Sequence, residues 1–232
     1  MTYTLHYVPD NASLIVRLAL LELEVPFSTK LVDRQNQNQN SAAYLHLNPN
    51  GLIPVMETPD GIIFEAAAIL LWLADRHGAL APSVQDHERA CALKWLFWLS
   101  NTLHPSLRML FYPEKYVDTE IALTEIPAQN QKHRFFSMLV MIEVSLSREP
   151  LFAISTPPNI LQLYLTVCLR WLALYPKRET EWFDLGRWPK LQELCQSLET
   201  RSSVMQAALA EGLGSTALSN PSYASPPEGS AT

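Results

Sequence analysis

The densest structural signals in this chain of 232 residues lie in residues 48–78, which read NPNGLIPVMETPDGIIFEAAAILLWLADRHG. Turn residues fill the first four positions, and a second turn signal, TPDG at residues 58–61, separates two short apolar runs. The apolar segment over residues 66–74 predicts a buried helix, because no polar face interrupts it. Gly78 is a typical helix end. The stretch therefore predicts two short strands joined by a tight turn and followed by a helix.

Pro54 stands at the head of the first of these strands, where it has no N–H to donate to a neighbouring strand. One interpretation is a strand-end proline inside a packed unit. The other is a cis peptide bond between Ile53 and Pro54, which turns the main chain of Ile53 outward toward a ligand. The residues alone leave both interpretations open.

The first 79 residues predict an α/β domain. An apolar helix between two strands forms a β-α-β unit, which implies parallel strands. A polar low-complexity loop, QNQNQN, and a short helix then lead into the strand-strand-helix stretch. The expected elements before that stretch are a strand at 3–8, a helix at 13–23, a strand at 25–32, the loop at 35–40 and a helix at 41–47.

Strand signals end at a linker-like segment, and residues 86–211 predict an all-helical domain. Asn159 and Gln162 have the spacing of a capping box. Residues 212–232 are rich in Ser, Pro and Gly and predict a tail, which either folds back through Tyr223 or stays loose. Helices are expected over residues 86–111, from after Pro127 to 147, and over 160–174, 188–198 and 201–210.

Composition narrows the function classes. The net charge of −6 disfavours nucleic-acid binding, and the longest apolar runs are too short to span a membrane. The three cysteines have no metal-ligand or dithiol spacing, so no metal cofactor is expected, and their small number fits a reducing cytoplasm. The N-terminal residues MTYTLHYVPD lack the features of a signal peptide.

Several motifs, in this order, resemble the soluble glutathione S-transferases. NPNGLIPVMETPDG is similar to the family's N-P-x-G-x-V-P-x-L followed by an acidic turn, and FEAAAILLWLADRHG to its E-S-x-A-I-x-x-Y-L. Residues 4–27 resemble the first β-α-β unit of the bacterial beta class, and residues 102–104, 169–171 and 209–213 resemble motifs of its helical domain. The resemblance covers about residues 1–213. It implies a thioredoxin-like domain, residues 1–79, followed by an all-helical domain.

The resemblance also implies a glutathione site in the first domain. Ile53, before a cis Pro54, pairs its main chain with the cysteinyl part of the ligand, much as a sheet edge accepts a peptide strand. Glu65 matches the acidic residue that binds the γ-glutamyl end. Ala66 replaces the family's serine, so only its N–H at a helix N-terminus is left for the carboxylate, and affinity falls by up to about tenfold. Arg34, or a Gln of the polar loop, is a candidate partner for the glycyl carboxylate.

The residue that activates the glutathione thiol is an open question, because the beta-class cysteine falls on Ala12. Ser13, four residues before Arg17, resembles the theta-class spacing and can donate to a thiolate, a charge that the helix dipole also favours. The position of Ser13 is equally consistent with a purely structural role at the start of the helix. Asn11 is a second candidate through its amide, although a simple helix cap is the more ordinary interpretation.

Residues of the helical domain complete the expected site. The resemblance places His104 at the cleft between the domains, where it can transfer a proton or orient an electrophile; without the resemblance it is an ordinary surface or core-edge histidine. Phe111, Tyr112 and Trp171 are candidates for an apolar second-substrate pocket, or else core aromatics. Pro105 follows His104, where the family often has a lysine, and predicts a kink.

Two functions follow. The first is a glutathione S-transferase-like enzyme that uses glutathione as co-substrate and transfers it to small hydrophobic electrophiles. The alternative is a non-catalytic ligand-binding or interaction protein on the same fold, which Ala12 and Ala66 favour; a glutathione-dependent isomerase or dehalogenase also remains open. We further expect a homodimer, which the low charged content of 17% favours, and neither nucleic-acid nor membrane partners.

Overall fold

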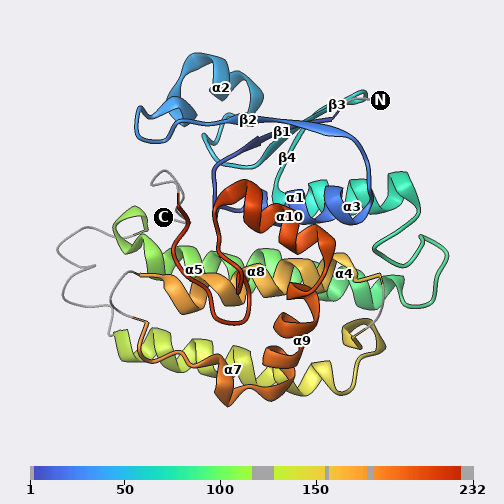
Figure 1. Ribbon diagram of the computed structural model, residues 1–232, viewed down its shortest axis with the longest axis vertical. Helices are drawn as coiled ribbons and strands as arrows, with labels where there is room; N and C mark the ends of the chain where they lie inside the picture. The colour runs from blue at the N-terminus through green and yellow to red at the C-terminus, as the bar shows by residue number, and fades with distance from the viewer. Residues whose placement is uncertain (1–2, 117–127, 155–156, 177–179, 226–232) are drawn as a thin grey trace.

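The computed structural model describes residues 3–116, 128–154, 157–176 and 180–225. A sheet with its helices lies above a larger all-helical part (Figure 1). The sheet has the strand order β2-β1-β3-β4, in which β1 is parallel to β2 and antiparallel to β3. The elements of this part are β1 (Tyr3–Tyr7), α1 (Ser13–Glu22), β2 (Phe27–Leu31), η1 (Asn38–Asn40), α2 (Ala42–Leu47), β3 (Val55–Thr58), β4 (Gly61–Phe64) and α3 (Ala66–His77). The thioredoxin-like β-α-β arrangement predicted from sequence is confirmed.

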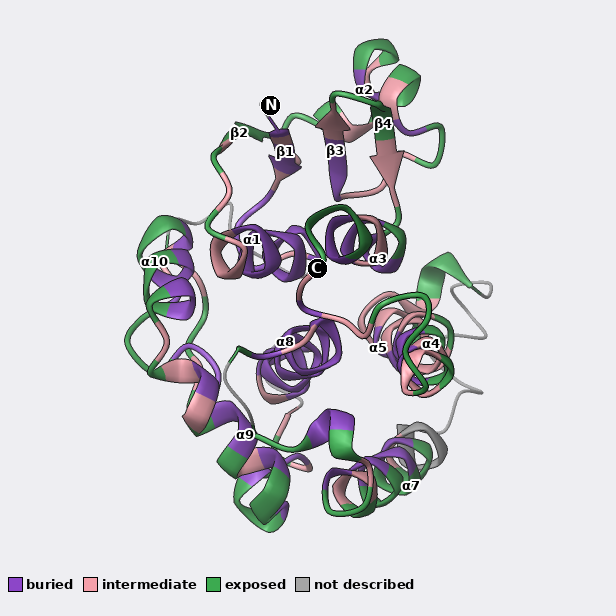
Figure 2. Ribbon diagram, turned by 90° about the vertical axis from the view of Figure 1, so that its right-hand side faces the viewer, coloured by how far each residue is buried: buried purple, intermediate pink, exposed green. Residues whose placement is uncertain are grey.

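The helices α1 and α3 lie between the sheet and the helical part, whereas α2 lies beyond the opposite face of the sheet (Figure 2). Helix α1 is buried over residues 13–20, because the sheet covers one side of it and helices cover the others. Its uniform apolarity therefore has a structural cause, since a helix apolar all round is stable only when buried. The ends of α1 and α3 are thereby brought to the boundary between the two parts.

The helical part surrounds α8, which is buried along almost its whole length. Asn159 Oδ1 accepts hydrogen bonds from the N–H groups of Leu161 and Gln162, and Gln162 Oε1 accepts one from Asn159 N at 2.9 Å, so the predicted capping box is confirmed. The helices are α4 (Arg89–Trp98), α5 (His104–Phe111), α7 (Ala128–Leu146), α8 (Ile160–Leu174), α9 (Pro189–Glu199) and α10 (Ser202–Glu211).

The single helix expected over residues 86–111 is instead two α-helices joined by a π-helical turn, η2 (Leu99–Leu103). Pro105 has no N–H to bond the preceding turn, and the helix widens at that point. This π-helical turn agrees with the kink that Pro105 predicts from the sequence. Residues 117–127, which directly precede α7, lie outside the described residues.

Residues 212–225 fold back onto the helical part. Tyr223 Oη donates to the carbonyl of Leu174 at 2.9 Å, and Arg170 donates to the carbonyls of Ala217 and Ser222. Of the two alternatives for this segment, the folded-back one therefore applies as far as residue 225. In the part of the chain that the structure describes, no helix has the length and apolarity needed to cross a membrane.

Candidate functional site

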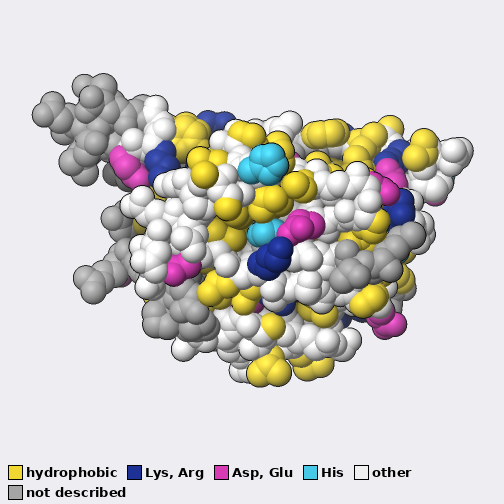
Figure 3. Space-filling model, turned by 90° about the horizontal axis from the view of Figure 1, so that it is seen from above, with side chains coloured by type: hydrophobic (Ala, Val, Ile, Leu, Met, Phe, Trp, Pro, Cys, Tyr) yellow, Lys and Arg dark blue, Asp and Glu magenta, His cyan; other side chains and the backbone are white. Residues whose placement is uncertain are grey.

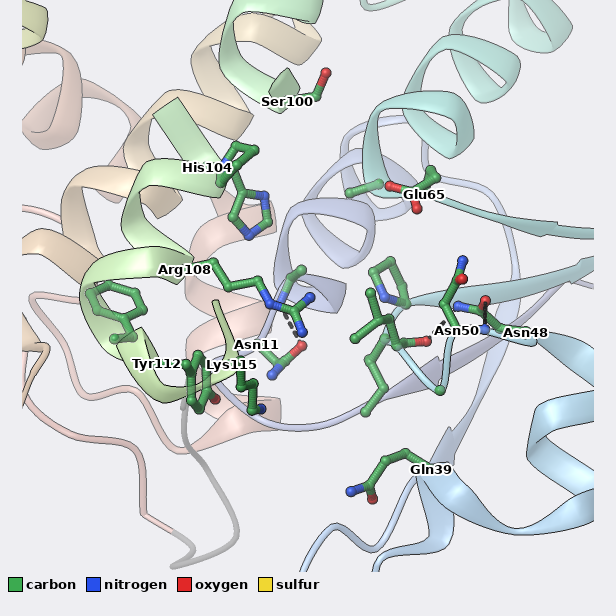
Figure 4. Close-up of a pocket in the computed structure, with 18 of the residues that line it drawn as sticks. Asn11, Gln39, Asn48, Asn50, Glu65, Ser100, His104, Arg108, Tyr112 and Lys115 are labelled. Carbon is green, nitrogen blue, oxygen red and sulfur yellow. Dashed lines mark hydrogen bonds between the residues drawn. The ribbon is translucent and has the colours of Figure 1, made fainter. Parts of the chain in front are cut away.

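A pocket of about 560 Å³ lies between the sheet-containing part and the helical part. Its volume is within the range of small-molecule sites. All of the site residues predicted from sequence except Ser13 line it: Asn11, Arg34, Ile53, Pro54, Glu65 and Ala66 from the first part, and His104, Phe111, Tyr112 and Trp171 from the second. Figure 4 shows Arg108, Tyr112 and Lys115 on one side of this space and Glu65, Asn48 and Asn50 on the other.

The loop before β3 forms one wall of the pocket. The peptide bond between Ile53 and Pro54 is cis, the isomer that the family resemblance implies. Two side chains hold the carbonyl of Leu52, because Tyr44 Oη donates to it at 2.9 Å and Asn48 Nδ2 at 2.8 Å. The loop is therefore fixed by its own hydrogen bonds, and Ile53 is presented in a defined position.

The N-terminus of α3 forms a second wall. Glu65 is exposed and occupies the N-cap position with φ of +71°, a backbone conformation that non-glycine residues rarely adopt. Such strained residues concentrate at functional sites. Ala66 follows it as the first helical residue, so that the carboxylate of Glu65 and the N-terminal N–H groups of α3 lie next to one another.

Arg34 connects the two parts of the molecule across the pocket. Its Nη2 donates to Tyr112 Oη at 3.2 Å, so a residue after β2 meets a residue at the end of α5. Gln39, from the polar loop, lines the pocket as well. Both candidates for a carboxylate partner therefore lie at the site.

Ser13 requires a correction, since its side chain does not line the pocket. The residue is completely buried, and its Oγ donates to the carbonyl of Val8 at 3.1 Å and accepts from Val8 N at 3.2 Å. The hydroxyl therefore fixes the turn between β1 and α1, which is the structural interpretation of the two that the sequence left open. Asn11, two residues earlier, does line the pocket, and its Oδ1 accepts from Ala12 N at 2.8 Å.

His104 contacts aromatic residues of α8. Its Nδ1 lies 2.8 Å from Tyr164 Oη, and its ring packs against Trp171 with 5.1 Å between the ring centres. Burial lowers the pKa of His104 to about 4, and the charge of Arg108 acts in the same direction. The imidazole is therefore neutral at neutral pH, and it offers one donor and one acceptor nitrogen but no charge.

The sequence interpretation missed two cations of the pocket, Arg108 and Lys115. Arg108 follows His104 by four residues on α5, and residues at that spacing share a helix face, so this neighbour was detectable. Lys115 belongs to the short η3 turn (Pro113–Lys115) beyond the end of α5, where no periodic pattern points to it.

The fold and the pocket define a class of protein: a thioredoxin-like domain joined to a helical domain, with a polar cleft between them. Residues 12–76 match the family model for the glutathione S-transferase N-terminal domain. Together with the fold, this match makes the first part of the chain similar to the glutathione S-transferases. Bacterial beta-class enzymes are among its structural neighbours, although the chain has Ala12 where that class has its cysteine.

Individual relatives cover different shares of the chain. Glutathione S-transferase GstB from Escherichia coli is 36% identical over 91 residues, which are 38% of this chain and 44% of the relative, so the matched part is less than half of that protein. Glutathione S-transferase GST-4.5 from Xanthomonas campestris is 26% identical over 211 residues, covering 90% of this chain and 98% of the relative.

Two solved structures show the same architecture over almost the whole chain. A beta-class enzyme from Sphingomonas chungbukensis has a TM-score of 0.72 at 25% identity and covers 89% of this chain and 98% of its own. A sphingomonad glutathione S-transferase complexed with glutathione also has a TM-score of 0.72 at 25% identity, covering 91% of this chain and 100% of its own.

Proposed function

We propose that this protein binds glutathione in the pocket and transfers it to a small electrophile with a hydrophobic body. The observation that carries the proposal is the convergence of three features on one cavity: the residue before the cis proline, the N-terminus of α3 with Glu65, and the turn before α1 with Asn11. A related structure that contains glutathione supports the same ligand.

Each part of glutathione has a partner of suitable chemistry in this arrangement. The main chain of Ile53 pairs with the cysteinyl peptide unit, as in the addition of a strand. Glu65 binds the γ-glutamyl ammonium, and the N–H groups at the start of α3 bind the adjacent carboxylate. Arg34 or Gln39 binds the glycyl carboxylate.

The thiol then lies near the turn before α1. We assign its stabilisation to the Asn11 amide and to the N-terminal dipole of α1, in place of Ser13. The thiol proton is lost to water, and the thiolate attacks an electrophilic carbon held against Phe111 and Trp171. His104, as a neutral imidazole, orients that electrophile through a hydrogen bond.

Two assays test the proposal. The protein should be retained on immobilised glutathione and should conjugate chlorodinitrobenzene. Replacement Glu65→Gln should lower glutathione affinity by roughly tenfold, since a charge-assisted contact to the ammonium is lost. Glu193→Gln, an exposed carboxylate on α9, is the matched control and should bind normally.

The alternative function is a non-catalytic glutathione-binding protein. It is favoured by one specific observation, that neither Ala12 nor the buried Ser13 offers a hydroxyl or thiol to the pocket. Retention on glutathione without conjugation of any electrophile would select this alternative. Absence of both retention and conjugation would overturn the proposal altogether.

We further propose a cytoplasmic homodimer. Cys91, Cys168 and Cys195 are all free thiols, which suits a reducing compartment. Figure 3 shows hydrophobic side chains scattered between few charged ones on the face that carries the sheet. Large exposed apolar residues of the first part and of α4 are Leu31, Leu45, Ile62 and Phe97. Sedimentation of a monomer at micromolar concentration would contradict the dimer.

A further inference from the structure

The charge of the pocket is opposite in sign to the charge of the chain. The whole chain has a formal net charge of −6. The described residues that line the pocket include three permanent or near-permanent cations, Arg34, Arg108 and Lys115, and a single carboxylate, Glu65. Such a local excess of positive charge concentrates anions at the site.

The three cations meet around Tyr112 and the end of α5. Lys115 Nζ lies 3.8 Å from the centre of the Tyr112 ring, and Arg34 donates to the hydroxyl of the same residue. Arg108 extends from α5 into the pocket toward Asn11 (Figure 4). Three like charges in one region repel one another, and burial together with Arg108 and Arg34 lowers the pKa of Lys115.

One nearby described carboxylate, Glu114, partly offsets the lowering of the Lys115 pKa. Among the described residues, however, no carboxylate forms an ion pair with the side chain of Arg108 or Lys115. The Nε of Arg108 is buried and has no hydrogen-bond partner within the described ranges. A buried donor without a partner is costly, so an anionic ligand that satisfies it is favoured.

Glutathione as thiolate has a formal charge of −2, which equals the +2 of the pocket lining in total, but the two sets of charges are placed differently. In the arrangement proposed above, its ammonium is matched by Glu65, its γ-glutamyl carboxylate by the α3 N-terminus and its glycyl carboxylate by Arg34 or Gln39. The thiolate adds one negative charge opposite Arg108 and Lys115, two cations. One positive charge is left at the helical side of the pocket, beside the aromatic residues Phe111 and Trp171.

We propose that the second substrate is an aromatic electrophile that bears a carboxylate, with the ring against Phe111 and Trp171 and the carboxylate held by Arg108 and Lys115. The inference rests on the proposed glutathione transfer and narrows its substrate class. In a nucleophilic aromatic substitution, the thiolate forms a carbon–sulfur bond, the carbon–chlorine bond breaks, and chloride leaves with the electron pair. The step requires no oxidant or reductant.

Two probes of similar size, one anionic and one neutral, test the inference: 4-chloro-3-nitrobenzoate and 4-chloro-3-nitrobenzamide. After each kcat/KM is divided by the uncatalysed rate, the benzoate should be preferred by about tenfold, the effect of one charge-assisted contact. Arg108→Gln and Lys115→Gln should each reduce this ratio several-fold. Lys190→Gln, an exposed lysine on α9, should leave the ratio unchanged.

A binding measurement separates this inference from the proposed function. Binding of each probe without glutathione is followed by quenching of tryptophan fluorescence, and the benzoate should bind more tightly than the benzamide, with the difference reduced in Arg108→Gln. If this preference holds but glutathione is neither bound nor transferred, the proposed function alone fails. If glutathione is transferred and both probes bind and react equally, or both variants leave the ratio unchanged, the anionic substrate is ruled out.

Discussion

Asn11 and Ser13 are two positions apart, yet their side chains have different surroundings. Asn11 faces the pocket, whereas Ser13 is buried against the main chain of Val8. Asn11 lies in the turn before the N-cap residue Ala12, whereas Ser13 is the first residue of α1. Neighbouring residues at a helix start can therefore have a binding role and a structural role respectively, and only the position of the turn decides between them.

Replacement of these two residues should have separable effects. Asn11→Ala should raise the pKa of the bound glutathione thiol and lower kcat/KM by about tenfold, because one hydrogen bond to the thiolate is lost. Ser13→Ala should leave that pKa unchanged and lower the free energy of unfolding by about 1–3 kcal/mol, since the polar groups of Val8 lose their partner. The thiolate's ultraviolet absorbance as a function of pH, with urea unfolding, measures both. A raised thiol pKa in Ser13→Ala would restore the assignment that the structure disfavours.

His104 should make stability depend on pH in the acidic range. Its pKa in the folded protein is lowered by burial to about 4, whereas a histidine in the unfolded chain titrates near 6.5. The unfolded state therefore binds the proton first, so the stability present above pH 6.5 is lost as the pH falls toward 4. With allowance for partial exposure of the side chain, the loss is about 2 kcal/mol. Urea unfolding at several pH values should show this loss in the wild type and a smaller one in His104→Gln; equal losses would contradict the lowered pKa.

At the scale of elements, the start of α8 contains the strongest local signal in the helical part. Asn159 caps two N–H groups and also donates through Nδ2 to the carbonyl of Leu151. Asn159→Ala should lower the free energy of unfolding by about 1–2 kcal/mol without changing glutathione affinity. Asn159→Ser, which retains a capping oxygen, should lose less. Equal losses in the two variants would show that capping is not the source of the stability.

The elements that the sequence predicted well are those whose signals are local. The turn residues at 58–61, the capping pair before α8 and Gly78 at the end of α3 act through bonds to near neighbours, and each is found where expected. The π-helical turn between α4 and α5 was predicted only as a kink, because the loss of one N–H at Pro105 does not specify how the helix adjusts.

The residues of the candidate site that could be predicted from the sequence are those that belong to family motifs. Ile53, Glu65 and His104 follow from such motifs and line the pocket. Lys115 and the burial of Ser13 depend on how the helical part packs against the sheet, which no local pattern encodes. The positive charge of the pocket is likewise a property of the assembled molecule, since its cations are separated by up to about eighty positions in the sequence.

At the scale of the whole molecule, one buried carboxylate joins the sheet-containing part to the helical part. Asp10 is fully buried and accepts hydrogen bonds from Arg170 Nε at 2.8 Å, Arg170 Nη2 at 3.0 Å, Trp171 Nε1 at 3.2 Å and Tyr175 Oη at 3.0 Å. Its N–H donates to Glu211 of α10, which also pairs with Arg17 of α1. The same Arg170 holds residues 217 and 222. The turn before α1, helices α8 and α10, and residues 217–222 are therefore all linked to the carboxylate of Asp10 or to its partner Arg170.

Removal of the charge of Asp10 should destabilise the whole protein in a single transition. Asp10→Asn keeps the size of the side chain and tolerates the φ of +55° at this position, but it leaves the charge of Arg170 buried and unpaired. Breaking one side of a buried ion pair costs about 3–5 kcal/mol, and adding Arg170→Met should recover part of the loss because no unpaired charge remains.

The control is Glu193→Gln, in an exposed pair, which should change the free energy of unfolding by less than about 1 kcal/mol. Circular dichroism and tryptophan fluorescence during urea unfolding should give coincident transitions. A small loss in Asp10→Asn, or a double variant no more stable than the single one, would mean that the junction rests on apolar packing and not on this charge.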